Sequence, residues 1–235
     1  MITTGYPRSS ARKTEIVDVA NGVSCSDMVD FPVEMHGAVG ANLGGTFVVC
    51  SGYFGPYSDK CYKLTNGMWE EFATMKEKRE AAAAVVHNDK LHVFGGFSGS
   101  SHLQTSETIS VDGEVSYGPD LPTTVVRHAM TKINDTVSLL SGGTTDTNSA
   151  SAKTWYYNHD TEAFTSGPDL LKGRRSHGSA INVDRVTKAK IVVVTGGFIG
   201  NGNKLDSTEM LINGQWQTGT IQCRKQKYFH LLKFY

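Results

Sequence analysis

The stretch AAAAVVHNDKLHVFGGFSGSSHLQTSETISVDGEVSYG, residues 81–118, decides the fold. It contains four short runs typical of β-strands, AAAAVVH, LHVFGG, SETISV and EVSYG, separated by NDK, by a loop rich in glycine and serine, and by DG. The second run is apolar throughout, as expected for a strand covered on both faces, whereas the others alternate more. The stretch therefore predicts an antiparallel sheet of four short strands.

The pair of small residues that ends the apolar run recurs along the chain. FVVCSG ends at Gly52, LHVFGG at Gly96, VSLLSGG at Gly143 and IVVVTGG at Gly197, at intervals of 44, 47 and 54 residues. Hairpin turn signals recur in the same phase, because the next turn begins 14, 16, 17 and 16 residues after each of these glycines. The turns are Asn21-Gly22, Asn66-Gly67, Asp112-Gly113, Asp160-Thr161 and Asn213-Gly214.

A four-stranded sheet of this size cannot bury both faces alone, so repeats of roughly 45 to 50 residues predict an all-β fold, a β-propeller whose blades pack around an axis. We expect a single domain over residues 1–235. It consists of a partial hairpin (13–32), four full blades (36–75, 80–121, 126–170 and 176–217) and an atypical tail (218–235). The paired glycines are structural here, because larger side chains would collide with the neighbouring blade. They are Gly52, Gly95, Gly96, Gly142, Gly143, Gly196 and Gly197.

The sequence resembles the kelch repeat. The resemblance rests on Gly95-Gly96 and Gly196-Gly197, and on Trp69 and Trp216, each of which follows a turn glycine by two residues. It is weaker where Ser51 replaces the first glycine and where Phe164 takes the tryptophan position. Kelch propellers usually have six blades, sometimes five or seven. The resemblance therefore implies closure with five blades or a chain that is a piece of a longer protein.

Composition limits the partners. The 23 basic and 23 acidic side chains balance, so no global field would attract nucleic acid. No apolar run reaches the roughly eighteen residues of a membrane span, and the first residues lack the apolar core of a signal peptide. The compartment, cytoplasmic or extracellular, stays open.

The cysteines allow two interpretations. None of Cys25, Cys50, Cys61 and Cys223 has CxxC or zinc-finger spacing. Cys50 ends one strand and Cys61 begins the next, so antiparallel pairing could form a disulfide in an oxidising compartment. Buried free thiols are the alternative. The sequence Asn134-Asp135-Thr136, a glycosylation acceptor pattern on a predicted exposed turn, points toward the oxidising compartment.

The kelch resemblance implies that the residues before each first strand and the loops between the second and third strands (54–60, 98–104, 144–153 and 199–205) share a ligand-binding face. Arginines there would favour a carboxylate or an acidic peptide, although each could instead cap backbone carbonyls or pair with Glu107 or Glu209. Aromatic side chains of the loops would contact a partner or pack under their own loop. The candidate partner-binding residues are Arg79, Arg127, His128, Arg174, Arg175, His177, Phe54, Tyr57, Phe97, His102 and Phe198.

These features predict a protein-binding module that is not an enzyme and needs no cofactor. The resemblance implies a substrate-recognition or cytoskeletal adaptor, which would bind a partner segment at the loop face. The alternatives are an extracellular carbohydrate- or matrix-binding propeller and an enzyme of galactose-oxidase or sialidase type. No set of acid, base and nucleophile is visible, and no histidine pair has the spacing of metal ligands, which favours a scaffold over an enzyme.

Overall fold

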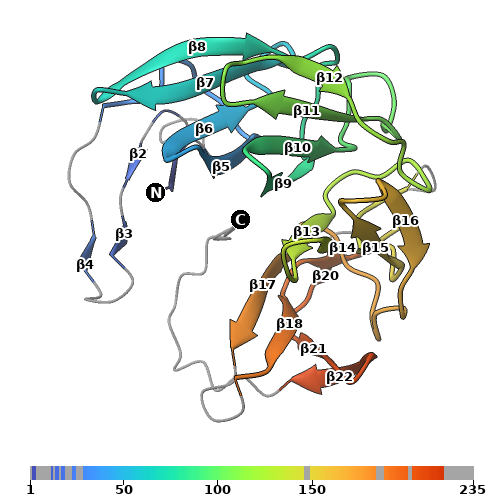
Figure 1. Cartoon of the computed structure of the whole chain (residues 1–235). Coiled ribbons are helices and arrows are strands. Elements are labelled where there is room, and N and C mark those ends of the chain that lie inside the picture. Colours follow the sequence, from blue (N-terminus) through green and yellow to red (C-terminus); the bar gives the residue numbers. More distant parts are fainter. Residues whose placement is uncertain are drawn as a thin grey trace.

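The computed structural model describes residues 29–145, 149–183, 188–200 and 203–219, together with residues 2–3, 12, 14–15, 17–18 and 23–24. This part of the chain is all-β and contains no α-helix. Four four-stranded antiparallel sheets follow one another along the chain, and in each the strands keep their sequence order from one edge to the other. Figure 1 shows the four sheets arranged in succession along an arc.

The sheets have the following strands. The first contains β5 (Val39–Leu43), β6 (Thr46–Cys50), β7 (Lys60–Thr65) and β8 (Met68–Thr74). The second contains β9 (Ala83–His87), β10 (Lys90–Phe94), β11 (Ser106–Ser110) and β12 (Val115–Tyr117). The third contains β13 (Ala129–Lys132), β14 (Val137–Ser141), β15 (Thr154–Asn158) and β16 (Ala163–Ser166). The fourth contains β17 (Gly178–Val183), β18 (Lys190–Thr195), β21 (Thr208–Ile212) and β22 (Gln215–Gly219).

The described residues also contain three two-stranded sheets. β1 (Ile2–Thr3) pairs with β2 (Thr14–Glu15), and β3 (Val17–Asp18) pairs with β4 (Val23–Ser24). β19 (Phe198–Ile199) pairs with β20 (Asn203–Lys204) in the last loop between a second and a third strand. Most of the predicted tail, residues 220–235, lies outside the described residues.

The predicted hairpin turns that lie within the described residues join the third and fourth strands of each sheet. Asn66 and Gly67 both have positive φ, 51° and 77°, and Asn213 and Gly214 have nearly the same values, 50° and 77°. Two positive φ angles in a two-residue loop define the turn that matches the twist of β-strands, and asparagine followed by glycine is its preferred sequence. The turn at Asn21-Gly22 lies outside the described residues.

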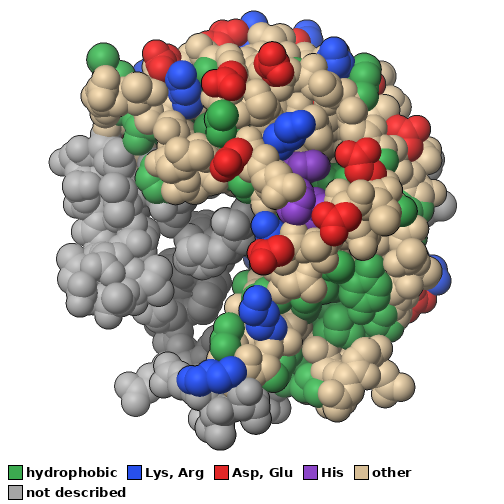
Figure 2. All heavy atoms as spheres, in the orientation of Figure 1, with side chains coloured by type: hydrophobic (Ala, Val, Ile, Leu, Met, Phe, Trp, Pro, Cys, Tyr) green, Lys and Arg blue, Asp and Glu red, His purple; other side chains and the backbone are tan. Residues whose placement is uncertain are grey.

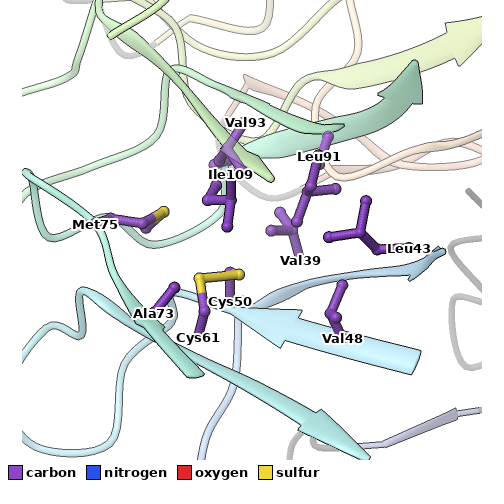
Figure 3. Packing of buried hydrophobic residues seen from close by; sticks show 12 residues of the cluster. Val39, Leu43, Val48, Cys50, Cys61, Ala73, Met75, Leu91, Val93 and Ile109 are labelled. Carbon is purple, nitrogen blue, oxygen red and sulfur yellow. A yellow bond between two sulfur atoms is a disulfide. The ribbon is translucent and has the colours of Figure 1, made fainter. Parts of the chain in front are cut away.

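Apolar side chains fill the space between successive sheets. Figure 3 shows the first of these layers, where Val39 and Leu43 of the first sheet face Leu91, Val93 and Ile109 of the second. A second cluster joins the second and third sheets through Phe94, Leu140 and Tyr157, and a third joins the last two sheets through Leu139, Val194 and Trp216. Each sheet thus buries at least one face against a neighbouring sheet, which an isolated four-stranded sheet could not do.

In the second and third sheets the first glycine of the pair lies against the chain that leads into the next sheet, and the second glycine lies against the chain that leads into its own sheet. Gly95 and Gly96 have φ angles of 59° and 104°, which glycine adopts without strain. A Cβ atom on Gly95 would lie 2.5 Å from the carbonyl oxygen of Val125, which belongs to the chain leading into the next sheet. The collision expected from the sequence is therefore present at Gly95, and it involves a backbone atom that a rotamer change cannot move. It is absent at Gly196, where a Cβ atom would come no closer than 3.7 Å to the carbonyl oxygen of Leu205.

Candidate partner-binding face

Four equivalent segments carry the chain into the first strand of each sheet, and we call them the lead-in segments: residues 35–38, 79–82, 125–128 and 174–177. Their third residues are joined by backbone hydrogen bonds that run from sheet to sheet. The amide of Ala81 donates to the carbonyl of Gly37, that of Arg127 to Ala81, and that of Ser176 to Arg127, each over 2.8 Å. All four of these residues have positive φ, between 51° and 66°. This ladder holds the lead-in segments side by side.

The loops between the second and third strands lie on the same face as the lead-in segments. In each sheet, the residue that follows the glycine pair (Ser51-Gly52 in the first sheet) forms a β-bridge with the second residue of the lead-in segment. The pairs are His36 with Tyr53, Glu80 with Phe97, Val126 with Thr144, and Arg175 with Phe198. The loop between the second and third strands then bridges back to the same residue, as Tyr57 does to Tyr53 and His102 to Phe97. We call this surface the loop face.

Five rings form a continuous row across the first two sheets of the loop face, and we call it the aromatic row. The centroid of His36 lies 5.3 Å from that of Tyr53, Tyr53 lies 4.7 Å from Tyr57, Tyr57 lies 5.5 Å from Phe97, and Phe97 lies 5.7 Å from His102. All five side chains are partly buried. Each ring therefore holds its neighbour in place and still offers part of its surface to solvent.

Charged groups border the aromatic row. The Glu80 carboxylate lies 3.3 Å from Nδ1 of His36. Burial, followed by the negative charge of Glu80, raises the pKa of Tyr57, and the positive charge of Arg127 opposes this shift. Tyr57 thus stays a neutral phenol that can donate a hydrogen bond, with an exposed guanidinium and a carboxylate both within electrostatic reach.

The other two sheets present a different surface at the same face. Thr144 and Val126 take the aromatic and charged positions in the third sheet, and both are buried. In the fourth sheet Phe198 is partly buried and pairs with Arg175, which is also partly buried. Phe54 lies at the tip of the first loop with 39% of its surface exposed. Rings, small side chains and arginine thus succeed one another around the face.

Two arginines predicted to contact a partner are structural, which corrects the prediction for Arg79 and Arg174. Both are fully buried. Arg79 donates to the carbonyl of Gly95 over 2.8 Å and to the carboxylate of Glu107 over 2.7 Å. The remaining charge partner of Arg79 is Glu77, at 3.0 Å. The alternative interpretation, a guanidinium that caps carbonyls and pairs with a glutamate of the sheet, holds at this position.

Arg174 repeats this arrangement in the fourth sheet. It donates to the carbonyl of Gly196 over 2.9 Å and to the carboxylate of Glu209 over 2.5 Å. Glu209 in turn accepts the backbone amides of Leu171 and Lys172 over 2.7 and 3.1 Å. Glu107 likewise accepts the backbone amides of Lys76 and Glu77. Each carboxylate therefore fastens the segment that leaves one sheet to the third strand of the next.

Apolar pairs replace these ion pairs in the other two sheets. Met35 stands where Arg79 stands, and it packs in one cluster with Tyr62, which takes the place of Glu107. In the third sheet the corresponding residues are Val125 and Trp155, which share another cluster. Ionic and apolar pairs thus alternate along the four sheets at one site of the repeat.

His128 and His177 are also corrected, because both side chains are about 1% exposed and cannot reach a partner at the surface. The Nε2 atom of His177 lies 2.9 Å from the hydroxyl of Ser141 in the preceding sheet, which makes this histidine an inter-sheet contact. Of the predicted residues, Arg127, Arg175, Phe54, Tyr57, Phe97, His102 and Phe198 keep exposed or partly exposed surface on the loop face.

Sequence reasoning missed one member of this face, Tyr53, and it placed His36 and Glu80 on the face only as members of the segments before the first strands, without singling them out. Tyr53 follows its glycine pair directly, as Phe97 and Phe198 follow theirs, so the repeat alignment carried the signal for it. His36 and Glu80 are the lead-in residues that these rings bridge. Their identity differs in every repeat, so periodicity gave no indication of them.

Cys50 and Cys61 form a disulfide, with their sulfur atoms 2.09 Å apart. They lie directly opposite each other on β6 and β7, and both are fully buried in the layer between the first two sheets. Of the two possibilities that the sequence left open, a bridge or buried thiols, the structure contains the bridge. Cys25 and Cys223 lie outside the described residues.

Three histidines meet at the seam between the second and third sheets. The rings of His87 and His159 stack at 4.3 Å, and His92 lies 5.4 Å from His159. Burial, together with the neighbouring histidines, lowers the pKa of His92 to about 4 and that of His159 to about 3. Figure 2 shows histidine side chains at the surface over this seam. The described residues contain no group of three or more histidine, cysteine, aspartate and glutamate side chains suited to a metal ion.

Comparison with known proteins gives no identification: no protein-family model and no curated protein matches the chain. Within the described ranges, no helix has the length and apolar character required to cross a membrane.

Proposed function

We propose that the chain is a kelch-type β-propeller, or most of one, that acts as a non-catalytic protein-binding module at its loop face. The observation that carries the proposal is the aromatic row, which crosses two sheets on partly exposed rings whose loops pair with the lead-in segments. Loops supported by a rigid framework are the usual place of recognition, and aromatic rings supply large contact area at low conformational cost.

The chemistry of the loop face suits an extended segment of a protein partner. Apolar side chains of that segment would pack on the aromatic row, and the Tyr57 hydroxyl would offer a hydrogen bond. Arg127 and Arg175 are the candidate arginines that keep exposed surface, so they can pair with acidic side chains of the partner. Glu80 would exclude a carboxylate beside His36, which fixes the position of acidic groups toward the third and fourth sheets.

The test compares two double variants of the full chain. Tyr57→Ser with Phe97→Ser removes the centre of the aromatic row. The matched control, Met68→Ser with Tyr117→Ser, removes side chains that are 67% and 56% exposed on the outer strands. Partners captured by cross-linking and then purified should bind the first variant at least about tenfold more weakly than the wild type and the control equally well. Equal affinity of the wild type and the first variant contradicts the proposal.

A second pair of substitutions tests the preference for acidic partners. Arg127→Ala with Arg175→Ala should weaken binding of the same purified partner, and the loss should shrink as salt is raised. A loss of binding that does not depend on salt would show that the two arginines do not bind acidic groups of the partner through their charge.

A second candidate function is carbohydrate or matrix binding outside the cell. The Cys50–Cys61 disulfide favours it, because such bonds persist mainly in oxidising compartments. The same rings that could pack on a protein segment could stack on sugar rings. Binding of the wild type to immobilised oligosaccharides, lost in the Tyr57→Ser, Phe97→Ser variant, would select this function over the first.

A further inference from the structure

The turn between β13 and β14 presents an asparagine that the loop face does not use. Asn134 and Asp135 are exposed at this turn, and Thr136 is partly exposed. Among all asparagines of the sequence, Asn134 alone is followed, two positions later, by serine or threonine. This spacing is the acceptor pattern for attachment of a sugar to the asparagine side chain.

The side chain of Asn134 is held in one orientation by its own turn. Its Oδ1 atom accepts the backbone amides of Thr136 over 2.9 Å and Val137 over 2.8 Å. The hydroxyl of Thr136 donates to the same oxygen over 3.3 Å. All three bonds use the oxygen, so none of them occupies the Nδ2 atom, which is the atom that a sugar would take. The turn brings the amide and the hydroxyl of the acceptor pattern together at an exposed tip.

The disulfide supplies an independent observation. The Cys50–Cys61 bond is buried between the first two sheets and is part of their packing. Disulfides of this structural kind form in compartments outside the reducing cytosol, and sugar transfer to asparagine belongs to proteins that pass through the same compartments. A chain that forms this bond therefore also meets the conditions under which Asn134 can be modified.

From these two observations we infer that Asn134 is an attachment site for an N-linked glycan. The Nδ2 atom of Asn134 forms a bond to the anomeric carbon of an acetylated amino sugar that is activated as a lipid diphosphate. The bond between that carbon and the diphosphate breaks, the diphosphate leaves with the electron pair, and Nδ2 loses one proton. No oxidation or reduction takes place.

The position of the site leaves the loop face free. Asn134 precedes β14, whereas the glycine pair and the loop face follow the other end of the same strand. Five residues of extended strand span about 17 Å, so the first sugar begins well away from the aromatic row. A glycan on Asn134 would shield the turn side of the third sheet without covering the loop face.

The experiment expresses the full chain behind a cleavable secretion leader in animal cells and examines only molecules from which the leader has been removed. Cleavage shows that those molecules entered the compartment where the sugar is transferred. We expect a single mobility shift that is removed by peptide N-glycosidase, with Asn134 converted to aspartate in the tryptic peptide 133–153. Leader-free wild type with unmodified Asn134 overturns the inference.

Three variants identify the acceptor. Thr136→Val should abolish the shift, although the Asn134 oxygen can still accept both backbone amides, and Thr136→Ser should retain it because the hydroxyl is present. Lys90→Thr places the acceptor pattern on the exposed Asn88-Asp89 turn of the second sheet and should add a second glycan. A shift that survives Thr136→Val would place the sugar elsewhere and refute the site. Binding at the loop face should be the same with and without the glycan, so this test and that of the proposed function fail independently.

Discussion

Replacing Glu209 by glutamine tests whether the buried carboxylate that pairs with Arg174 also fastens the segment leaving the third sheet to the fourth sheet. The substitution keeps the shape of the side chain but removes the charge that faces Arg174 over 2.5 Å at a fully buried position. A glutamine also has one acceptor oxygen for the two amides of Leu171 and Lys172, so one of these hydrogen bonds is lost. Removing one partner of a buried pair costs about 3–5 kcal/mol of unfolding free energy, because the remaining charge stays desolvated.

The corresponding substitution in the second sheet should cost less. Arg79 retains the carboxylate of Glu77 at 3.0 Å after Glu107→Gln, so its charge stays partly compensated. Glu71→Gln is the surface control. The Lys60–Glu71 pair joins side chains that are 39% and 44% exposed, and breaking it should cost about 0–1 kcal/mol.

Urea unfolding followed by tryptophan fluorescence measures the three variants. Trp216 lies in the sheet of Glu209, so its signal reports on the affected seam. We expect Glu209→Gln to be the most destabilised, followed by Glu107→Gln and then Glu71→Gln, as shifts of the urea midpoint at similar slope. A Glu209→Gln protein that unfolds at the same urea concentration as the surface control would refute this role of the ion pair.

Three further predictions concern stability. The unfolding free energy should fall as pH drops below about 6.5, by at most about 1.4 kcal/mol per pH unit for each of His92 and His159. Both histidines take up a proton in the unfolded chain near this pH, but in the folded protein their pKa values are lowered to about 4 and about 3. Unfolding midpoints that do not change with acid pH would contradict this. Replacing Cys50 and Cys61 by alanine should lower the unfolding free energy by about 2–4 kcal/mol in urea titrations, and no change would show that the bond adds nothing. Gly95→Ala should cost more than about 2 kcal/mol by calorimetry, since its Cβ would lie 2.5 Å from a carbonyl oxygen, and a near-neutral result would contradict the close approach.

The repeated framework could be predicted from the sequence because its signals are local. Turn chemistry at Asn66-Gly67 and Asn213-Gly214 fixes a backbone shape, and positive φ at Gly95 and Gly96 allows the tight passage between sheets. These residues act through their own conformation, so their spacing alone located the strands. The β-branched and apolar runs before each glycine pair gave the buried second strands in the same way.

The loop face could be predicted only in part, because burial depends on what lies opposite. Arg79 and Arg174 look no different in the sequence from Arg127, yet the first two occupy the first position of the lead-in segment and Arg127 the third. At the first position the arginine side chain is buried against a carboxylate, and two residues later it is exposed to solvent. The positions of Tyr53 and Phe97 recur in the repeat, but the contact of Tyr57 with Phe97 joins two repeats and leaves no periodic trace in the sequence.

Hydrogen exchange at the lead-in ladder tests most directly whether the sheets form one body around a shared face. The amides of Ala81, Arg127 and Ser176 lie outside the strands, yet each donates to the preceding lead-in segment. We expect these amides to exchange about as slowly as the amide of Val93 in a central strand, since they open only when sheets separate. Exchange as fast as that of the turn amide of Gly67 would mean that the ladder does not hold the sheets together, so the sheets would not form one body around the loop face.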